Sequence, residues 1–528
     1  MALVGIGEHG PARTPVPQAP RLRVAVFADA RQQPRWVAEA FAKVARSDCA
    51  EIVAIGISAA SQGERPWVAR AYNGFDQWAF GADGSEPVDL VAAIAQGRTL
   101  APPFRNLLEL DLDVAFALGA VDEAPLDGVA RLGVWRFQVD GAAEVAAGEP
   151  LTASALAVRL APGAVPRLAC QSWARTDPFS VSRNRAALLQ KTAQFPLRAL
   201  REARRSGREW LEQRPLASVN RGQTTISVSA EPLGNRGLSL ISIGSRILRR
   251  GVEKALAIEQ WSLAFSFAQR DPNPQLGGFT RIVPPPDRDW SEPFALAKNG
   301  RYYVFFKEMV RGADKAHIAM LELSADGRWS APVRVLERDY HVSHPFVVEH
   351  DGQLYLIPES ARNGTVEAYR CVDFPRRWRL ERVLLDGVRL VDATFYRSAE
   401  RCWLFANDAA GEGGGFNDEL HLFHARDLLD DWQPHGRNPV RSDARCARPA
   451  GALYWRNGAL YRPGQICVPR YGAGITLNRV LRLTPEAYAE RQIERIVPAP
   501  DSGLLGMHTV NRAADLTLVD VLARRRRL

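Results

Sequence analysis

The C-terminal half of the chain repeats one short phrase four times, and this repetition limits what the chain can fold into. Each copy has a polar residue, an apolar run, a polar turn and a second apolar and aromatic run. The copies are SEPFALAKNGRYYVFF from Ser291, SHPFVVEHDGQLYLIP from Ser343, LVDATFYRSAERCWLF from Leu390 and ARPAGALYWRNGALYR from Ala447. Two apolar runs joined by such a turn are typical of a β-hairpin. This half is therefore predicted to consist of hairpins.

The spacing of the copies predicts how the hairpins are arranged. Aligned on their turns, they place Glu292, His344, Asp392 and Arg448 at one equivalent position, at intervals of 52, 48 and 56 residues. A fifth, weaker copy, GMHTVN, adds His508 after a further 60 residues. A period of about 50 residues fits the blades of a β-propeller and is too long for most solenoids. We therefore predict a five-bladed propeller over residues 260–521.

A propeller brings equivalent residues together, because the first strand of each blade faces the central channel. We expect a ring in which Glu292, His344, Asp392 and His508 are candidate catalytic residues and Arg448 binds substrate. The competing interpretation is structural, since polar channel residues also satisfy strand ends and waters. Against it, each ionisable group placed there must be paired or solvated to avoid a desolvation cost of about several kcal/mol.

A second polar layer follows the ring members in the sequence. Glu359 ends the segment LIPES, and Lys307 and Asn407 occupy the equivalent positions in FFKE and FAND. A Glu beside cations stays ionised, whereas a Glu against aromatic faces has a raised pKa and can act as a general acid. Both alternatives stay open for Glu359. The loops add further candidate ligands for a phosphate or carboxylate, with loop capping as the alternative role: Arg462, Gln465, Arg470 and Tyr471.

The N-terminal half follows a different pattern. RLRVAVFADA from Arg21 predicts a buried strand, PRWVAEAFAKVARS a helix and EIVAIGISAA a second strand, which together form a βαβ unit. Further strands are expected at residues 113–119 and 131–137, so a Rossmann-like α/β domain is predicted over residues 21–190. Neither GxGxxG nor a P-loop follows the first strand, and no dinucleotide or nucleoside triphosphate site is predicted.

The order of DVAFALGA, RLGVWRF and GEPLTASALAVRL resembles the catalytic domain of methionyl-tRNA and sugar formyltransferases, across residues 21–190. The resemblance puts Arg136 where that family has its catalytic Asn and Gln138 where it has its catalytic His. An amide has no accessible pKa near neutrality, so Gln138 cannot shuttle a proton. The segment that should supply the family's Asp, APGAVPRLACQSW, contains no acid. The resemblance therefore implies a formyltransferase-like fold kept for binding or assembly.

The propeller segment resembles a second group. SHPFVVEHDGQLYLIPES, the pair ARPAGALYW and LYRPGQ, and GMHTVN are similar to the propeller-like N-terminal region of plant glucosamine inositolphosphorylceramide transferases. More distantly, they resemble the five-bladed glycoside hydrolases of family 43. The resemblance implies carbohydrate or glycolipid chemistry. On the family 43 pattern Glu292 takes the place of the catalytic base, His344 that of a second acid, and Glu359 is the acid candidate, so the hydrolase set is not reproduced.

The stretch between the two halves, residues 191–259, is predicted to be a helical, basic linker. Two amphipathic basic helices are expected, at residues 182–210 and 239–258, around a polar linker at 221–237. We expect each helix to pack on its own domain, with binding to a membrane surface as the alternative. Residues 1–20 are predicted to be a disordered lead and residues 522–528 a basic tail.

Composition excludes several classes of protein. The net charge of +9 is explained by arginine-rich helices and the tail, with weak attraction to an anionic membrane surface or a phosphate-bearing substrate as the alternative. No zinc-finger or RNA-binding signature supports nucleic acid as a partner. No apolar run approaches the roughly 20 residues that span a bilayer. Six cysteines without a CxxC pair indicate reduced thiols, and with no signal peptide apparent we expect a cytoplasmic location.

These observations predict a two-domain, carbohydrate-active protein, an α/β domain followed by an all-β propeller, that performs glycosyl transfer or glycosidic-bond chemistry in the propeller funnel. The substrate would be a carbohydrate, glycolipid or sugar phosphate, with a sugar nucleotide as candidate donor and no metal or other cofactor; the oligomeric state stays open. One alternative is a non-catalytic carbohydrate- or glycolipid-binding module of a glycan-assembly system, which predicts ring residues locked in mutual salt bridges. Another is formyl or acyl transfer by the N-terminal domain.

Overall fold

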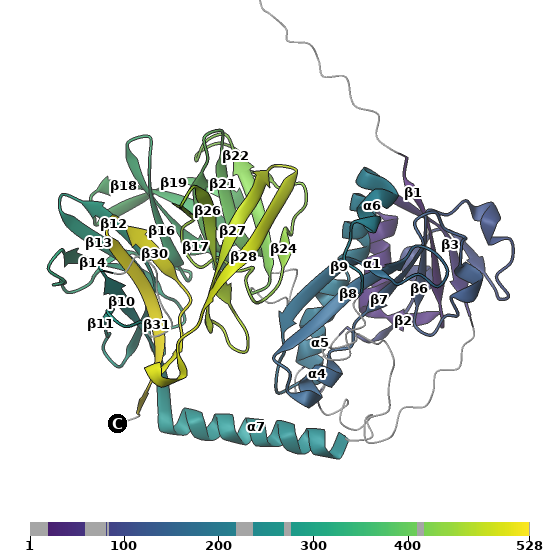
Figure 1. Cartoon of the computed structure of the whole chain (residues 1–528), viewed down its shortest axis with the longest axis horizontal. Coiled ribbons are helices and arrows are strands. Elements are labelled where there is room, and N and C mark those ends of the chain that lie inside the picture. Colours follow the sequence, from purple (N-terminus) through teal and green to yellow (C-terminus); the bar gives the residue numbers. More distant parts are fainter. Residues whose placement is uncertain are drawn as a thin grey trace, which may run out of the picture.

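The computed structural model describes residues 20–58, 76, 81, 84–217, 236–268, 276–408 and 417–526. The chain forms two bodies, an N-terminal α/β domain and a C-terminal propeller, and the long helix α7 (Arg236–Leu256) runs beneath both (Figure 1). The predicted lead at residues 1–19 and most of the predicted polar linker, residues 221–235, lie outside the described residues.

A seven-stranded sheet forms the centre of the N-terminal domain, in the order β5-β3-β1-β6-β7-β8-β9. Strands β5, β3, β1, β6 and β7 are parallel, and β8 is antiparallel to both of its neighbours. The strands are β1 (Leu22–Ala28), β3 (Ala50–Ile57), β5 (Arg98–Leu100), β6 (Val114–Leu118), β7 (Val134–Gln138), β8 (Leu151–Arg159) and β9 (Arg167–Arg175). Strands β1 and β6 are almost wholly buried, as expected for parallel strands covered on both faces. The resemblance to formyltransferases stays a prediction.

Helices cover this sheet, and one of them corrects a predicted boundary. Helix α6 (Phe195–Glu212) was placed in the linker, but its apolar side chains Phe195, Leu200 and Leu211 are buried in the same core as helix α1 (Arg35–Ala45). The N-terminal domain therefore extends past residue 190. The other described helices of this domain are α3 (Leu90–Ile94), α4 (Ala142–Ala147) and α5 (Val181–Thr192).

The C-terminal body is a propeller of five antiparallel sheets, which confirms the predicted number of blades. In four of the blades, all strands are consecutive along the chain. They comprise β12 (Arg288–Lys298), β13 (Arg301–Val310), β14 (His317–Ser324) and β15 (Val333–Leu336); β16 (Ser343–His350), β17 (Gln353–Ser360), β18 (Thr365–Asp373) and β19 (Arg377–Asp386); β20 (Leu390–Arg397), β21 (Cys402–Asp408), β22 (Glu419–Ala425), β23 (Gln433–Pro434) and β24 (Arg441–Ser442); and β25 (Tyr454–Arg456), β26 (Ala459–Ile466), β27 (Gly474–Thr484) and β28 (Ala487–Ile496).

The fifth blade closes the ring with strands from both ends of the propeller segment. Its strands are β10 (Ala257–Ser266), β11 (Thr280–Ile282), β29 (Leu504–Gly506), β30 (Val510–Ala513) and β31 (Leu516–Arg526). Strands β10 and β31 pair over their whole common length, from Ala257 opposite Arg526 to Ser266 opposite Thr517. The propeller is thus longer at both ends than predicted, and most of the predicted basic tail belongs to strand β31.

The two bodies are docked through buried polar contacts. The Trp173 carbonyl of β9 accepts a hydrogen bond from the Ala444 amide at 2.8 Å. Arg198 of α6 donates to both Glu419 carboxylate oxygens, at 2.7 and 3.1 Å, and Lys191 of α5 is paired with Asp418. Although burial alone would raise the pKa of Glu419, Arg198 holds it at about 2. Glu419 therefore stays ionised at neutral pH, and its pair with Arg198 fixes the N-terminal domain beside the third blade.

The structure also describes the cysteines and the character of the helices. All six cysteines are free, and Cys49, Cys402, Cys446 and Cys467 are buried. Within the described ranges, no helix combines the length and the apolar character needed to cross a membrane.

Candidate functional site

Three ring residues lie in the same unusual backbone conformation. Glu292, His344 and Asp392 have φ angles of 57°, 42° and 54°. At each one the pairing with the next strand skips the ring residue and its successor, which is a β-bulge. A left-handed conformation at a residue other than glycine costs about 1–3 kcal/mol and persists only where its surroundings enforce it. The bulges therefore turn equivalent side chains of three blades out of the regular strand alternation.

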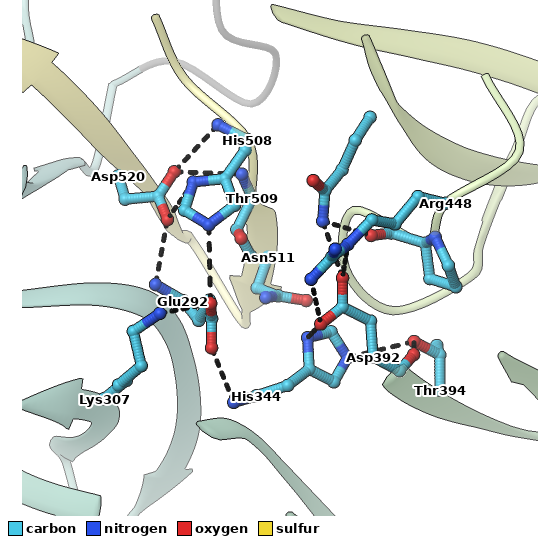
Figure 2. Close-up of polar contacts among 12 residues, drawn as sticks. Glu292, Lys307, His344, Asp392, Thr394, Arg448, His508, Thr509, Asn511 and Asp520 are labelled. Carbon is cyan, nitrogen blue, oxygen red and sulfur yellow. Dashed lines mark hydrogen bonds and ion pairs between the residues drawn. The ribbon is translucent and has the colours of Figure 1, made fainter. Parts of the chain in front are cut away.

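The structure brings all five ring residues into one network, shown in Figure 2. One half is centred on Glu292, whose carboxylate accepts hydrogen bonds from the His344 amide at 2.6 Å and the Lys307 ammonium at 2.8 Å. Nε2 of His508 lies 3.5 Å from the same carboxylate. Although burial alone would raise the pKa of Glu292, Lys307 and then His508 hold it well below its usual value. Glu292 is therefore an ionised acid enclosed by cations.

The other half is centred on Asp392, which is fully buried. Its carboxylate accepts hydrogen bonds from Arg448 at 2.6 and 3.3 Å and from the Gln465 amide at 2.7 Å. The imidazole Nδ1 of His344 lies 3.7 Å from Asp392 Oδ1 and connects the two halves. Despite burial, Arg448 and then His344 lower the pKa of Asp392. Asp392 is thus also ionised at neutral pH.

A residue that the repeat did not predict, Asp520, holds the network together. It lies on β31, is wholly buried, and accepts hydrogen bonds from the backbone amides of Glu292 at 2.8 Å and of His508 and Thr509 at 2.9 Å (Figure 2). Nδ1 of His508 lies 2.9 Å from the same carboxylate. Although burial alone would lower the pKa of His508, Asp520 and Glu292 raise it to about 9. The only sequence signal for Asp520 is a lone acid within the apolar run LTLVDVLA.

A second layer lies beside the ring, in which Lys307 and Glu359 are partly exposed and Asn407 is buried. Strand register places Lys307, Glu359 and Asn407 opposite the residue that precedes each ring member, so they are structurally equivalent. Glu359 is half-buried, and among the described residues its carboxyl group has no hydrogen-bond partner. Burial, and then the negative charge of Asp392, raise the pKa of Glu359 to about 8. Glu359 is therefore a protonated acid at neutral pH beside ionised carboxylates.

Asn407 contributes an unsatisfied amide to this layer. Its side chain is fully buried, and neither its nitrogen nor its oxygen has a hydrogen-bond partner in the described part of the chain. An orphaned buried amide costs about 1–3 kcal/mol, so such a group calls for a water or a ligand as partner. Asn407 is therefore a candidate contact for a bound molecule.

The four predicted loop ligands divide into two pairs. Gln465 bonds Asp392, and the Tyr471 ring lies 4.9 Å from the Arg448 guanidinium carbon and 5.1 Å from the His508 ring. Arg462 and Arg470 do not join them. Arg462 is fully buried and bonds Glu490 and two backbone carbonyls, and Arg470 pairs with Glu259 at 2.7 Å. Both guanidinium groups are held in ion pairs, and Arg462 lies within strand β26 rather than in a loop; a role of either residue in substrate binding stays a prediction.

Aromatic rings border the network. The ring centroid of Trp261 on β10 lies 4.2 Å from that of His508. No repeat or motif in the sequence pointed to this tryptophan. Together with Tyr471 it forms an apolar wall against the imidazole. Trp455 is 64% exposed, and its indole nitrogen donates to the Tyr396 hydroxyl at the hairpin end of its blade. Trp261 and Tyr471 are therefore the aromatic side chains that the ring itself offers to a ligand.

The propeller segment has known relatives. Residues 284–512 match the family model described as glucosamine inositolphosphorylceramide transferase 1, N-terminal. The match confirms the resemblance of this segment and includes all five ring residues, whereas Asp520 lies beyond it. The chain is 31% identical over 221 residues to glucosamine inositolphosphorylceramide transferase 1 of Arabidopsis thaliana and 32% identical over 203 residues to that of Oryza sativa subsp. japonica. These alignments cover 41% and 38% of this chain but only 29% and 27% of the relatives, so the chain spans less than a third of their length.

Solved glycoside hydrolases share a general similarity with the chain. The catalytic domain of a family 62 α-L-arabinofuranosidase from Coprinopsis cinerea is 12% identical, with a TM-score of 0.32 over 44% of this chain and 90% of the hydrolase. The family 117 glycoside hydrolase Zg3597 from Zobellia galactanivorans is 10% identical, with a TM-score of 0.33 over 51% of this chain and 91% of the hydrolase. The propeller assignment itself comes from the strand pairing described above.

In the N-terminal domain, the two positions that the formyltransferase resemblance singled out are Arg136 and Gln138. Arg136 of β7 lies 2.6 Å from the Glu123 carboxylate and donates to the Val121 carbonyl at 3.1 Å. Gln138, at the end of the same strand, is half-buried. Arg136 is thus engaged in an ion pair within its own domain.

The ring makes stability depend on pH. The pKa of His508 is raised from 6.5 to about 9, so its contribution is complete below pH 6.5 and is lost as the pH rises through 9. The raised pKa of Glu359 acts with the same sign, because its contribution is lost as the pH rises from 4.5 through about 8. We expect the thermal midpoint to fall between pH 6.5 and 9, and to fall less steeply in Glu359→Gln. Thermal unfolding followed by circular dichroism checks this, and equal slopes in both proteins would contradict it.

Proposed function

We propose that the propeller is a carbohydrate-active module in which Glu359 exchanges a proton with a glycosyl substrate bound in the funnel. The observation that carries this proposal is that two neighbouring carboxyl groups, those of Glu359 and Asp392, have pKa values shifted in opposite directions. Glu359 has a pKa raised to about 8 and is accessible, whereas Asp392 beside it is buried and ionised. Two acids whose surroundings separate their pKa values can divide the roles of proton donor and charge stabiliser.

The neighbouring cations suit a substrate with an anionic leaving group. Lys307 and Arg448 are both partly accessible, with side chains 20% and 11% exposed. Their charges would stabilise negative charge that develops on a departing phosphate, while protonated Glu359 donates its proton to the departing oxygen. The acceptor oxygen bonds to the sugar, and its proton is released to solvent. We therefore propose a sugar nucleotide or other sugar phosphate as donor. The relatives are named glucosamine inositolphosphorylceramide transferases, and this name supports a glycolipid as acceptor.

A second candidate function is favoured by one specific observation. Glu292, His344, Asp392 and His508 are buried, and the imidazoles of His508 and His344 lie 3.5 Å from Glu292 and 3.7 Å from Asp392, which is the arrangement expected of a non-catalytic carbohydrate- or glycolipid-binding module. In that case the ring is a scaffold, and the second layer only binds. For the N-terminal domain we propose a formyltransferase-like scaffold without the proton relay, since Gln138 offers only an amide.

Ligand titrations test where the sugar binds. We expect one class among sugar nucleotides, sugar phosphates and free sugars to bind the full-length protein in calorimetric titrations. Replacing Tyr471 by Ala should weaken that binding roughly tenfold, because an aromatic face at the ring is lost. Trp455→Ala is the matched control and should leave the affinity unchanged. An affinity lowered by Trp455→Ala but not by Tyr471→Ala would place the site outside the funnel, and failure of every class to bind would contradict the proposal.

A further inference from the structure

Helix α7 contacts both bodies through a row of its described side chains. Near its middle, Ile243 is buried against Val145 and Val181 of the N-terminal domain, and Arg246 donates to the Val145 carbonyl at 2.9 Å. Toward its end, Arg250 pairs with Glu259 of β10 at 3.1 Å. These contacts recur every three to four residues and therefore define one inward face of the helix.

The opposite face carries an apolar stripe that the described part of the chain does not cover. Leu248, Val252 and Leu256 follow one another at intervals of four residues and are 71%, 49% and 68% exposed, and the adjoining Ile247 is 50% exposed. Residues at this spacing lie above one another on a helix. In Figure 1 the helix runs along the outside of both bodies. The helical spacing puts the stripe on the side opposite Ile243, Arg246 and Arg250, which contact them. The expectation that each basic helix packs on its own domain therefore holds for α6 but not for this face of α7.

Basic side chains lie along one flank and at one end of the stripe. The Arg249 side chain is 76% exposed, and its Nε atom lies 4.0 Å from Oε1 of Glu253. Glu253 also pairs with Arg524 of β31 at 3.2 Å, which places the basic end of that strand beside the end of α7. Burial, and then the positive charge of the nearby Arg525, lower the pKa of Arg281 of β11. Like charges gathered beside exposed apolar residues are unfavourable unless an anionic partner offsets them.

We propose that the stripe Leu248, Val252 and Leu256, with the neighbouring arginines, is a docking surface for an anionic lipid bilayer. A helix with an apolar face and arginine flanks lies in the plane of the membrane interface, with its apolar side chains among the acyl chains and its cations among the headgroups. The charge complementarity selects a lipid surface of net negative charge. Docking would hold the propeller at a membrane, where a glycolipid acceptor of the proposed reaction would be found, but the docking itself does not depend on that reaction.

Vesicle sedimentation tests the proposal directly. The full-length protein should sediment with vesicles of phosphatidylcholine containing about one third phosphatidylserine, and should do so much less with phosphatidylcholine alone or at 0.5 M NaCl. The double variant Leu248→Gln with Val252→Gln should bind the anionic vesicles at least about tenfold more weakly, because two inserted side chains are lost. Glutamine keeps a high helix propensity, so the helix itself is retained.

A matched control separates this surface from general stickiness. Leu481→Gln with Val383→Gln removes two comparably exposed apolar side chains, 55% and 40% exposed, from strands β27 and β19 of the propeller. This variant should leave vesicle binding unchanged. Equal binding of the α7 variant and wild type would overturn the proposal, as would absence of binding to anionic vesicles by wild type. Light scattering that shows a dimer of the wild type, lost in the α7 variant, would instead assign the stripe to contact with a second copy. None of these outcomes depends on turnover, so failure here leaves the proposed function standing.

Discussion

Replacing Glu359 by Gln should lower turnover of the glycosyl ligand by about 10²- to 10⁴-fold without lowering the thermal midpoint, which near neutral pH should rise because the variant no longer keeps a carboxyl group protonated. The substitution is nearly isosteric and removes only the ability to exchange a proton, which a general acid needs. Because the Glu359 carboxyl has no hydrogen-bond partner among the described residues, no buried ion pair is broken. Release of nucleotide or free sugar from the ligand found by titration measures the effect, with melting followed on the same sample.

Two further observations make this result specific. Wild-type turnover should fall as the pH rises through about 8, where Glu359 loses its proton. Glu349→Gln, on the exposed part of strand β16, is the matched control and should retain full turnover. Full activity of Glu359→Gln would refute its role as acid and leave the binding-module alternative in its place.

Removing the Asp520 carboxylate should lower the free energy of unfolding by about 3–5 kcal/mol. In Asp520→Ala three buried backbone amides lose their acceptor, and the imidazolium of His508 loses one of its two acids. Breaking a buried pair on one side leaves an uncompensated charge, which explains the size of the effect. Urea unfolding followed by tryptophan fluorescence measures it.

A surface ion pair provides the control for that measurement. Glu322→Ala breaks an exposed pair with Arg301, 2.9 Å long, and should cost no more than about 1 kcal/mol. Comparable losses in the two variants would mean that Asp520 does not hold the ring. The comparison therefore tests the network independently of any ligand.

Repetition explains which parts of the site the sequence could predict. Glu292, His344 and Asp392 occupy equivalent bulges, so aligning the hairpin turns was enough to bring them together. Asp520 contributes from strand β31, to which the repeated phrase does not extend, and no spacing rule pointed to it. The pairing of Arg462 was not predictable either, because its guanidinium is held by Glu490 on β28, two strands away in the same blade.

The amphipathic pattern alone also could not show what covers the apolar face of each basic helix. Helices α6 and α7 both alternate arginines with apolar residues, yet α6 buries its stripe in the N-terminal core and α7 leaves one uncovered. A helical period shows that a helix has an apolar face but not which body covers it. The number of blades, in contrast, followed from counting repeats, because each repeat supplies one sheet.

Closure of the fifth blade fixes the order in which the site is assembled. Strands β10 and β31 pair although about 260 residues separate them, as for Leu263 opposite Asp520. Such a distant pairing loses the entropy of closing a long loop before any strand contacts stabilise it. It therefore forms late and slowly. As a ribosome extends the chain, Glu292 emerges long before the carboxylate that holds its backbone amide. Four finished blades would therefore still lack the completed ring, and acquisition of function would coincide with the final strand rather than grow with each blade.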